Sequence, residues 1–180
     1  MVEVLLCSEN FVKAVSNISD NVAGKFILPS LREAQDINFR AVVGDILLEK
    51  LKDLVKNNQI DAEANAIYKE LLSKAKYFLA YQTIVEVTNK VTYKIGNFGV
   101  AKSSDENLQP VGVEELSRQT FYYQSKADAS CYDLQRWLWE NRNMIPELTE
   151  IQCGKIRSNL YSAASSGVFL GGARGKIVRK

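Results

Sequence analysis

The segment Gly171–Ile177 contains residue types that bind phosphate in nucleotide-binding loops, namely glycines followed by a lysine. Such a loop has a glycine five positions before its Gly-Lys pair and a serine or threonine after it. This chain has Leu170 and Ile177 at those two places. Only four residues follow Lys176, too few for the helix whose N-terminus would contact the phosphate. We therefore expect no nucleotide to bind here.

Acid–base chemistry has few candidates in this sequence. Histidine is absent, which argues against Ser-His and Cys-His catalysis and against histidine-ligated metals. The carboxylates that could act in pairs are Glu114 with Glu115 and Asp128 with Asp133. Side chains one or five positions apart on a helix point in different directions. We therefore expect a protein that is not an enzyme and that uses no cofactor and no metal.

The cysteines and the N-terminal residues indicate the compartment. Cys7, Cys131 and Cys153 are widely spaced, odd in number and without a CxxC pair, so we expect small buried thiols in a reducing cytosol. Glu3 stands where a signal peptide needs a basic residue, and the apolar runs are only a few residues long. We expect synthesis in the cytoplasm and no association with a membrane.

Charge is distributed unevenly along the chain. The formal net charge is +2, yet the residues from Ile151 to the end include six basic side chains and no acidic one. The remaining 17 basic and 21 acidic residues give the first 150 positions a net charge of about −4. This asymmetry indicates a basic C-terminal segment that meets an acidic partner, either protein or nucleic acid.

Residues 162–180 are rich in glycine, serine and basic residues and have no hydrophobic period, so we expect an extended arm. Three interpretations stay open: a solvated tail, a tail that docks into an acidic groove of a neighbouring subunit, and a segment that binds DNA. Apolar side chains among the charges favour docking, because an extended arm exposes them unless a partner buries them. The arm residues expected to bind a partner are Val168, Phe169, Leu170, Arg174, Lys176, Ile177, Arg179 and Lys180.

Helix-period hydrophobic patterns fill most of the chain before the arm. We expect Pro29 to break the second helix, because proline lacks the amide hydrogen and clashes with the preceding turn. The broad apolar stripe of the fourth helix predicts that it is central, with neighbours on more than one side. The expected helices span residues 9–15, 19–44, 45–57, 61–87 and 113–141, with a short turn or helix near 150–157.

Two of these helices have apolar faces that can be compared with a structure residue by residue. The face expected for residues 19–44 is Phe26, Ile27, Leu31, Ala34, Ile37, Ala41 and Val42. The face expected for residues 45–57 is Ile46, Leu47, Leu51, Leu54 and Val55.

Residues 91–102 interrupt the helical pattern. Val91–Ile95 alternates apolar and polar residues and is followed by a glycine-containing turn and by Val100–Lys102, which predicts a small β-hairpin. Phe98 in this turn is a possible interface residue. The expected fold class is mostly α: a helical bundle with two long helices, a β-hairpin inserted between them, and an extended C-terminal arm. The expected domain covers residues 1–161 and the arm residues 162–180.

Trp137 and Trp139 lie two positions apart on the last long helix and so point to different faces. We expect Trp137 to be part of the core. Trp139 is open to two interpretations, a partly exposed residue at the edge of the core or an anchor in an interface, where tryptophan is over-represented.

Several segments resemble a known family. These are Phe26–Ile37 followed by Val43–Leu51, the Tyr81-Gln82 pair, Asn97–Val100, and Trp137–Asn141 before Pro146. Together they resemble the head–tail connector proteins, also called adaptor or ring proteins, of tailed phages and prophages of Bacteroidetes hosts, crAss-like phages included. The resemblance covers most of residues 8–148 as a pattern and contains no single diagnostic motif.

The resemblance implies a structural virion protein at the head–tail junction. It implies a homo-oligomeric ring, usually of twelve copies, that docks on the portal protein and contacts other connector or tail proteins while packaged DNA passes through its channel. It also implies that the arm reaches the portal or a neighbouring ring. The alternative from the residues alone is a nucleic-acid-binding accessory protein that uses the basic arm.

Overall fold

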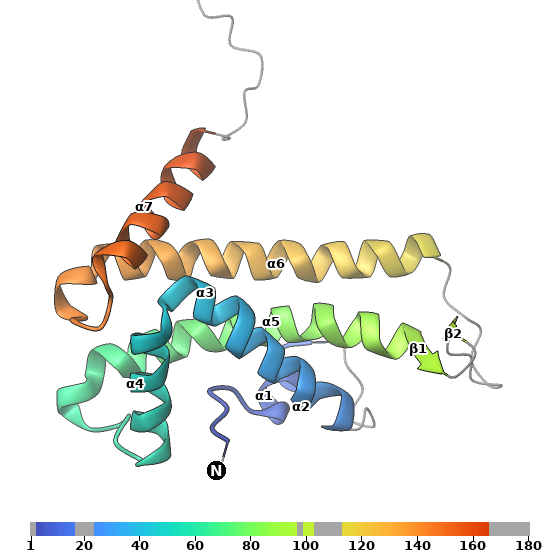
Figure 1. Cartoon of the computed structure of the whole chain (residues 1–180), viewed down its shortest axis with the longest axis horizontal. Coiled ribbons are helices and arrows are strands. Elements are labelled where there is room, and N and C mark those ends of the chain that lie inside the picture. The colour runs from blue at the N-terminus through green and yellow to red at the C-terminus, as the bar shows by residue number, and fades with distance from the viewer. Residues whose placement is uncertain (1–2, 17–23, 97–98, 103–112, 166–180) are drawn as a thin grey trace, which may run out of the picture.

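The computed structural model describes residues 3–16, 24–96, 99–102 and 113–165. The protein is built from helices of very different length, and two of them, α5 and α6, run the length of the molecule (Figure 1). The helices are α1 (Glu9–Ala14), α2 (Gly24–Glu33), the π-helix η1 (Ala34–Phe39), α3 (Arg40–Val43), α4 (Asp45–Lys56), the 3-10 helix η2 (Glu63–Asn65), α5 (Ala66–Thr92), α6 (Val113–Glu140), the 3-10 helix η3 (Arg142–Met144) and α7 (Glu150–Ser165).

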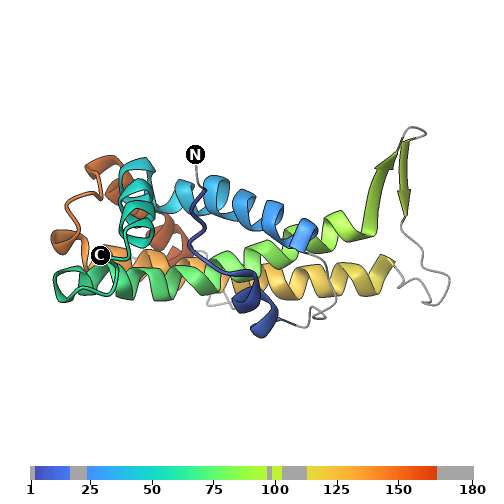
Figure 2. The ribbon, with the colours of Figure 1, turned by 90° about the horizontal axis from the view of Figure 1, so that it is seen from below.

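Helix α5 is the centre of the fold. It packs against α6 along its length and also against α1, α2 and η1, and Figure 2 shows α1 and the α2–α4 segment on opposite sides of it. Leu71, Leu79 and Ile84 are buried on this helix. The predicted central position is confirmed, because an apolar stripe this broad can only be buried by several neighbours.

Helix α6 also agrees closely with its prediction, ending one residue earlier than expected. Tyr123, Ala127, Leu134 and Leu138 form its buried face. Trp137 is in the core, as predicted, and its ring nitrogen donates a hydrogen bond to Glu70 Oε1 of α5 at 2.7 Å.

The predicted break at Pro29 is wrong. Pro29 lies inside α2, which continues without interruption into η1 and α3. Pro29 and Lys25, whose carbonyl loses its helical partner, are both exposed, so water can hydrogen-bond to that carbonyl. Ile27 and Leu31 on either side are buried, and this burial favours a continuous helix over one lost hydrogen bond.

The π-helix η1 changes which residues of the segment are buried. Ile37, expected in the core, is 66% exposed, and Ala41 is exposed as well. Gln35 and Phe39 are buried instead. A π-helix needs more residues per turn than an α-helix, so the face predicted at 3.6 residues per turn is wrong at Ile37 and Ala41, whereas Val42 is buried as predicted.

Gln35 of η1 holds the N-terminal segment. Its side-chain oxygen accepts a hydrogen bond from the Leu6 amide at 2.8 Å, and its side-chain nitrogen donates to the Val4 carbonyl at 3.1 Å. A buried amide that pairs with a neighbouring backbone in this way satisfies both of its polar groups.

The mainly α part of the predicted fold class agrees with the structure, but the hairpin as a component of the fold class is corrected. Four-residue segments, β1 (Tyr93–Gly96) and β2 (Gly99–Lys102), pair with each other in antiparallel register. They form a ribbon that extends past the helices (Figure 2), and no third strand joins it within the described ranges. Such a ribbon is too small to form a layer of a fold, and α5 continues to Thr92, through residues expected in the strand.

The division into a domain of residues 1–161 and an arm of residues 162–180 stays a prediction, whereas the extent of the last helix differs from expectation. The segment expected as a short turn or helix near 150–157 is the 16-residue helix α7, which passes through position 161 and ends at Ser165. Figure 1 shows α7 leaving the body at an angle to α6. The residues after Ser165 lie outside the described ranges, and so does the prediction of an extended arm there.

Candidate interaction surfaces

Five aromatic side chains from three helices form two groups that one lysine bridges, and we call the whole set the aromatic row. It consists of Phe11 on α1, Tyr77 and Tyr81 on α5, and Tyr122 and Tyr123 on α6. Phe11 and Tyr77 meet edge to face with ring centroids 5.4 Å apart, and Tyr77 and Tyr81 follow at 6.5 Å. Tyr122 and Tyr123 meet edge to face at 5.2 Å. Edge-to-face contacts of this kind fix ring positions.

Lys126 joins the two halves of the row. Its amine lies 4.4 Å from the ring centroid of Tyr122 and 5.3 Å from that of Tyr81. A hydrogen bond with the Tyr122 side chain and the nearby tyrosines raise the pKa of Lys126, so the amine stays charged at neutral pH. Tyr122 is 52% exposed and Tyr77 47% exposed, which leaves a rigid, cationic and aromatic surface in contact with solvent.

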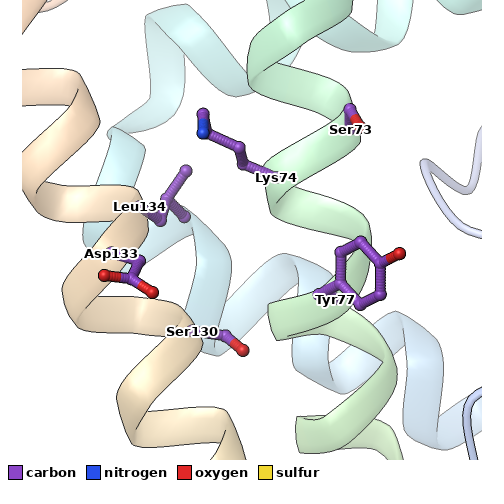
Figure 3. Close-up of a pocket in the computed structure, with 6 residues that line it drawn as sticks. All are labelled: Ser73, Lys74, Tyr77, Ser130, Asp133 and Leu134. Carbon is purple, nitrogen blue, oxygen red and sulfur yellow. The ribbon is translucent and has the colours of Figure 1, made fainter.

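A pocket of about 360 Å³ between α5 and α6 adjoins the row at Tyr77. Figure 3 shows that Lys74 and Tyr77 reach it from α5, and Asp133 and Leu134 from α6. Asp133 pairs with Arg136 at 3.2 Å, and Lys74 lies 4.0 Å from Glu70. The pocket therefore has an apolar floor made by the exposed ring of Tyr77 above the completely buried Leu134, with charged groups on its rim. Its six lining residues are Ser73, Lys74, Tyr77, Ser130, Asp133 and Leu134.

The start of α4 forms a different kind of surface. Ile46 is 58% exposed although it was expected in the core, because Leu47, Leu48 and Leu51 supply the buried face of this helix. The exposed carboxylates Asp45 and Glu49 flank it. We call Asp45, Ile46 and Glu49 the acidic knob.

Trp139 lies in a third area, at the end of the molecule where α6 meets α7. It is half-buried and packs against the core. The guanidinium of Arg142 lies 4.3 Å from its ring centroid and that of Arg157 6.0 Å, and Arg142 donates a hydrogen bond to the Trp139 carbonyl at 2.6 Å. The half-buried position fits a residue at the edge of the core, and its role as an interface anchor stays a prediction.

A pocket of about 400 Å³ beside Trp139 is bordered by Gly154 of α7. No atom lies within 4 Å of the position that a Cβ on Gly154 would take. We expect Gly154→Ala to stabilise the protein by about 0.5–1 kcal/mol, because alanine favours a helix interior over glycine. Thermal unfolding measures the change. Gly44→Ala is the matched control and should destabilise, because Gly44 has a φ of +82°; an equal response at both sites would contradict the expectation.

Cys7 is buried, as the sequence predicts. Burial raises the pKa of the Cys7 thiol to about 11, and burial together with Asp128 raises that of Cys131 to about 11. Thiols with such values are protonated and weakly nucleophilic at neutral pH. Cys131 and Cys153 are only half-buried, so the prediction is too strong for them.

Of the carboxylates considered in pairs from the sequence, Asp128 and Asp133 have separate partners. Asp128 accepts a hydrogen bond from the Gln124 amide at 2.8 Å, and Asp133 pairs with Arg136. Among the described residues, no group of three or more Cys, Asp or Glu side chains could hold a metal ion, and no helix is long and apolar enough to cross a bilayer.

The remaining predicted site residues lie outside the described ranges. These are Phe98 and the eight arm residues, Val168, Phe169, Leu170, Arg174, Lys176, Ile177, Arg179 and Lys180. The aromatic row was not predicted as a site. Its signal in the sequence is the i,i+4 spacing of Tyr77 and Tyr81 together with Tyr122-Tyr123, which becomes meaningful only once α5 and α6 are known to be neighbours.

The chain is a mainly helical protein whose most distinctive features are exposed aromatic and apolar surfaces. Residues 39–158 match a family of unknown function, DUF6712. The match covers two thirds of the chain, from the last residue of η1 into α7, and the protein belongs to this family. Comparison with curated proteins found no match, and neither did comparison with solved structures.

Proposed function

We propose that this protein is a structural virion protein that forms a ring in the head–tail connector of a tailed phage. In this proposal about twelve copies close into a ring that docks on the portal protein and contacts further connector or tail proteins. Packaged DNA passes through the channel. The resemblance of the sequence to connector proteins motivates the proposal, which includes no enzymatic role and no cofactor.

The observation that carries the proposal is the pair of unlike exposed surfaces on the folded body. The aromatic row involves α1, α5 and α6, whereas the acidic knob lies on α4. In Figure 2, α1 and α4 lie on opposite sides of α5. A ring needs two different complementary faces on each subunit, since its contacts run head to tail.

The position of α7 is a second support. Its Gln152 is buried and donates a hydrogen bond to the Ala41 carbonyl at 2.7 Å, so the start of α7 is anchored to α3. From there α7 leads away from α6 (Figure 1). A basic segment that follows such a helix would reach beyond the subunit, toward a portal or a neighbouring ring.

The test is the native mass of the full chain, alone and mixed with the portal protein of the same phage. A variant that ends at Ser165 keeps α7 and removes only the residues after it. We expect the full chain to form a defined complex with the portal and the shortened variant to lose most of its affinity, because the contacts of the arm are gone.

A second variant separates charge from apolar burial. Replacing Arg174, Lys176, Arg179 and Lys180 by glutamine keeps the length and the apolar residues of the arm. If charge makes the contact, this variant binds the portal more weakly than the wild type does, and the difference in affinity grows as the salt concentration is lowered. A full chain that ignores the portal but shifts DNA in a salt-sensitive manner would contradict the connector role and favour the accessory protein.

A further inference from the structure

The aromatic row and the α5–α6 pocket form one continuous surface. Tyr77 belongs to both, since it stacks on Phe11 and Tyr81 and also lines the pocket. Lys74 lies at the pocket and Lys126 in the row. Exposed tyrosines held rigidly by one another, beside an apolar hollow, are typical of the residues that dominate binding energy in protein interfaces.

The acidic knob has the complementary chemistry. Ile46 projects an aliphatic side chain from the first turn of α4, and Asp45 and Glu49 place carboxylates beside it. Each carboxylate has a partner within the subunit: Arg40 lies 3.2 Å from Asp45, and Lys52, which also pairs with Asp36, lies 3.1 Å from Glu49. The pair of Asp45 is exposed on both sides and contributes little to stability, so Asp45 can turn to a new cation at small cost. Glu49 is itself largely exposed, and Lys52 keeps Asp36 as a partner if Glu49 turns away.

We propose that the aromatic row and its pocket bind the acidic knob of a second copy of this chain. Ile46 enters the pocket over Leu134 and against the ring of Tyr77. Asp45 and Glu49 approach Lys74 at the pocket and Lys126 in the row. This contact deepens the proposed ring and rests on it, because it names the surfaces through which neighbouring subunits meet.

The charges in this area favour a copy of the chain over nucleic acid as the occupant. The pocket is lined by Asp133 as well as by Lys74, and Asp128 is exposed on the same helix as Lys126. A surface with interspersed acidic groups repels a phosphate backbone, which needs a sustained positive stripe. The acidic knob of a second copy fits better, because its apolar side chain can contact the apolar floor while its two carboxylates face the cations.

The arrangement also fixes the type of assembly. The row and the knob are different surfaces, and α1 of the row and α4 of the knob lie on opposite sides of α5 (Figure 2). The contact is therefore heterologous: each copy gives its knob to one neighbour and receives the knob of the other. Such contacts continue until rotation closes them into a ring.

The experiment measures self-association of the full chain by sedimentation velocity over a rising protein concentration. We expect the wild type to associate, and Ile46→Gln and Tyr77→Gln each to weaken association at least tenfold. Ile151→Gln and Tyr132→Gln make the same changes at exposed residues outside the contact and should associate like the wild type. Thermal unfolding shows whether each variant is folded, and Lys126→Glu provides a second row variant if Tyr77→Gln is not.

Mixing the two weakened variants tests the heterologous geometry. Ile46→Gln keeps an intact row, and Tyr77→Gln keeps an intact knob, so one sound contact can form between them. The mixture should give a 1:1 complex and nothing larger. A wild type that stays monomeric at every concentration, association unaffected by both variants, or a mixture without the 1:1 complex would each overturn the proposal.

Portal binding separates this inference from the proposed function. If the wild type forms a complex with the portal protein and Ile46→Gln forms the same complex with equal stoichiometry, the connector role stands and the knob contact fails. If the wild type associates with itself but forms no complex with the portal protein, and the knob and row variants abolish self-association, the contact stands and the connector role fails.

Discussion

Replacing Phe39 by alanine is expected to destabilise the protein by about 3–5 kcal/mol, the usual cost of removing a buried phenylalanine side chain. Phe39 is the last residue of the π-helix η1 and is completely buried. The π-helix packs against α5, the central helix. The cavity would therefore open in the core itself, where rigid neighbours on several sides limit collapse.

Urea denaturation monitored by circular dichroism measures this change, and Ile37→Ala is its control. Ile37 lies two residues earlier in the same π-helix and is largely exposed, so its truncation should change the free energy of unfolding by no more than about 0.5 kcal/mol. The reverse order, with Ile37→Ala the more costly, would mean that α2 continues as an ordinary α-helix and that the shifted face is wrong.

Replacing Gln152 by alanine is expected to destabilise the protein by about 1–3 kcal/mol. The buried Gln152 amide donates to the carbonyls of Ala41 and Val42, 111 and 110 positions away in the chain. These carbonyls lie in the last turn of α3, just before Gly44 turns the chain with a φ of +82°. Without the amide, acceptors near the helix end lose their partner. Hydrogen exchange should also show faster exchange in the first turns of α7.

Gln152→Glu is a second test of the same hydrogen bonds, because it keeps the size of the side chain and replaces the amide donor by a carboxylate oxygen. At neutral pH it places a carboxylate against two carbonyl oxygens, so it should destabilise more than Gln152→Ala. Burial and these oxygens raise the pKa of the introduced carboxyl in the folded state. Its stability should therefore recover as the pH falls through that pKa and the protonated group donates again. No recovery relative to the wild type at low pH would contradict the hydrogen-bond role of Gln152.

Tyr68 illustrates a similar tie between distant segments. Its hydroxyl donates to Glu147 Oε2 at 2.6 Å, linking the start of α5 to the loop that leads into α7. Burial first, and then this carboxylate, raise the pKa of Tyr68 to about 12. The hydroxyl remains a donor throughout the physiological range, so this link holds wherever Glu147 is ionised.

The sequence by itself determined the long helices. The apolar positions of α6 recur at helical spacing over 28 residues, and those of α5 form a stripe broad enough to require neighbours on several sides. Trp137 was placed in the core for the same reason. A few positions that depart from helical spacing do not obscure a pattern of this length, so the existence of both helices follows from the pattern alone. The bounds of α5 do not, because it begins at Ala66 and ends at Thr92 instead of spanning residues 61–87.

The tertiary structure decided the irregular features. Pro29 stays inside a helix because Ile27 and Leu31 on either side are buried while Lys25, whose carbonyl loses its partner, is exposed. The π-helix forms where Gln35 pairs with the backbone of the N-terminal segment. The aromatic row and the acidic knob likewise depend on which helices become neighbours. These outcomes depend on contacts between residues far apart in the chain. The hydrophobic periodicity of a single segment carries no information about the energies of such contacts.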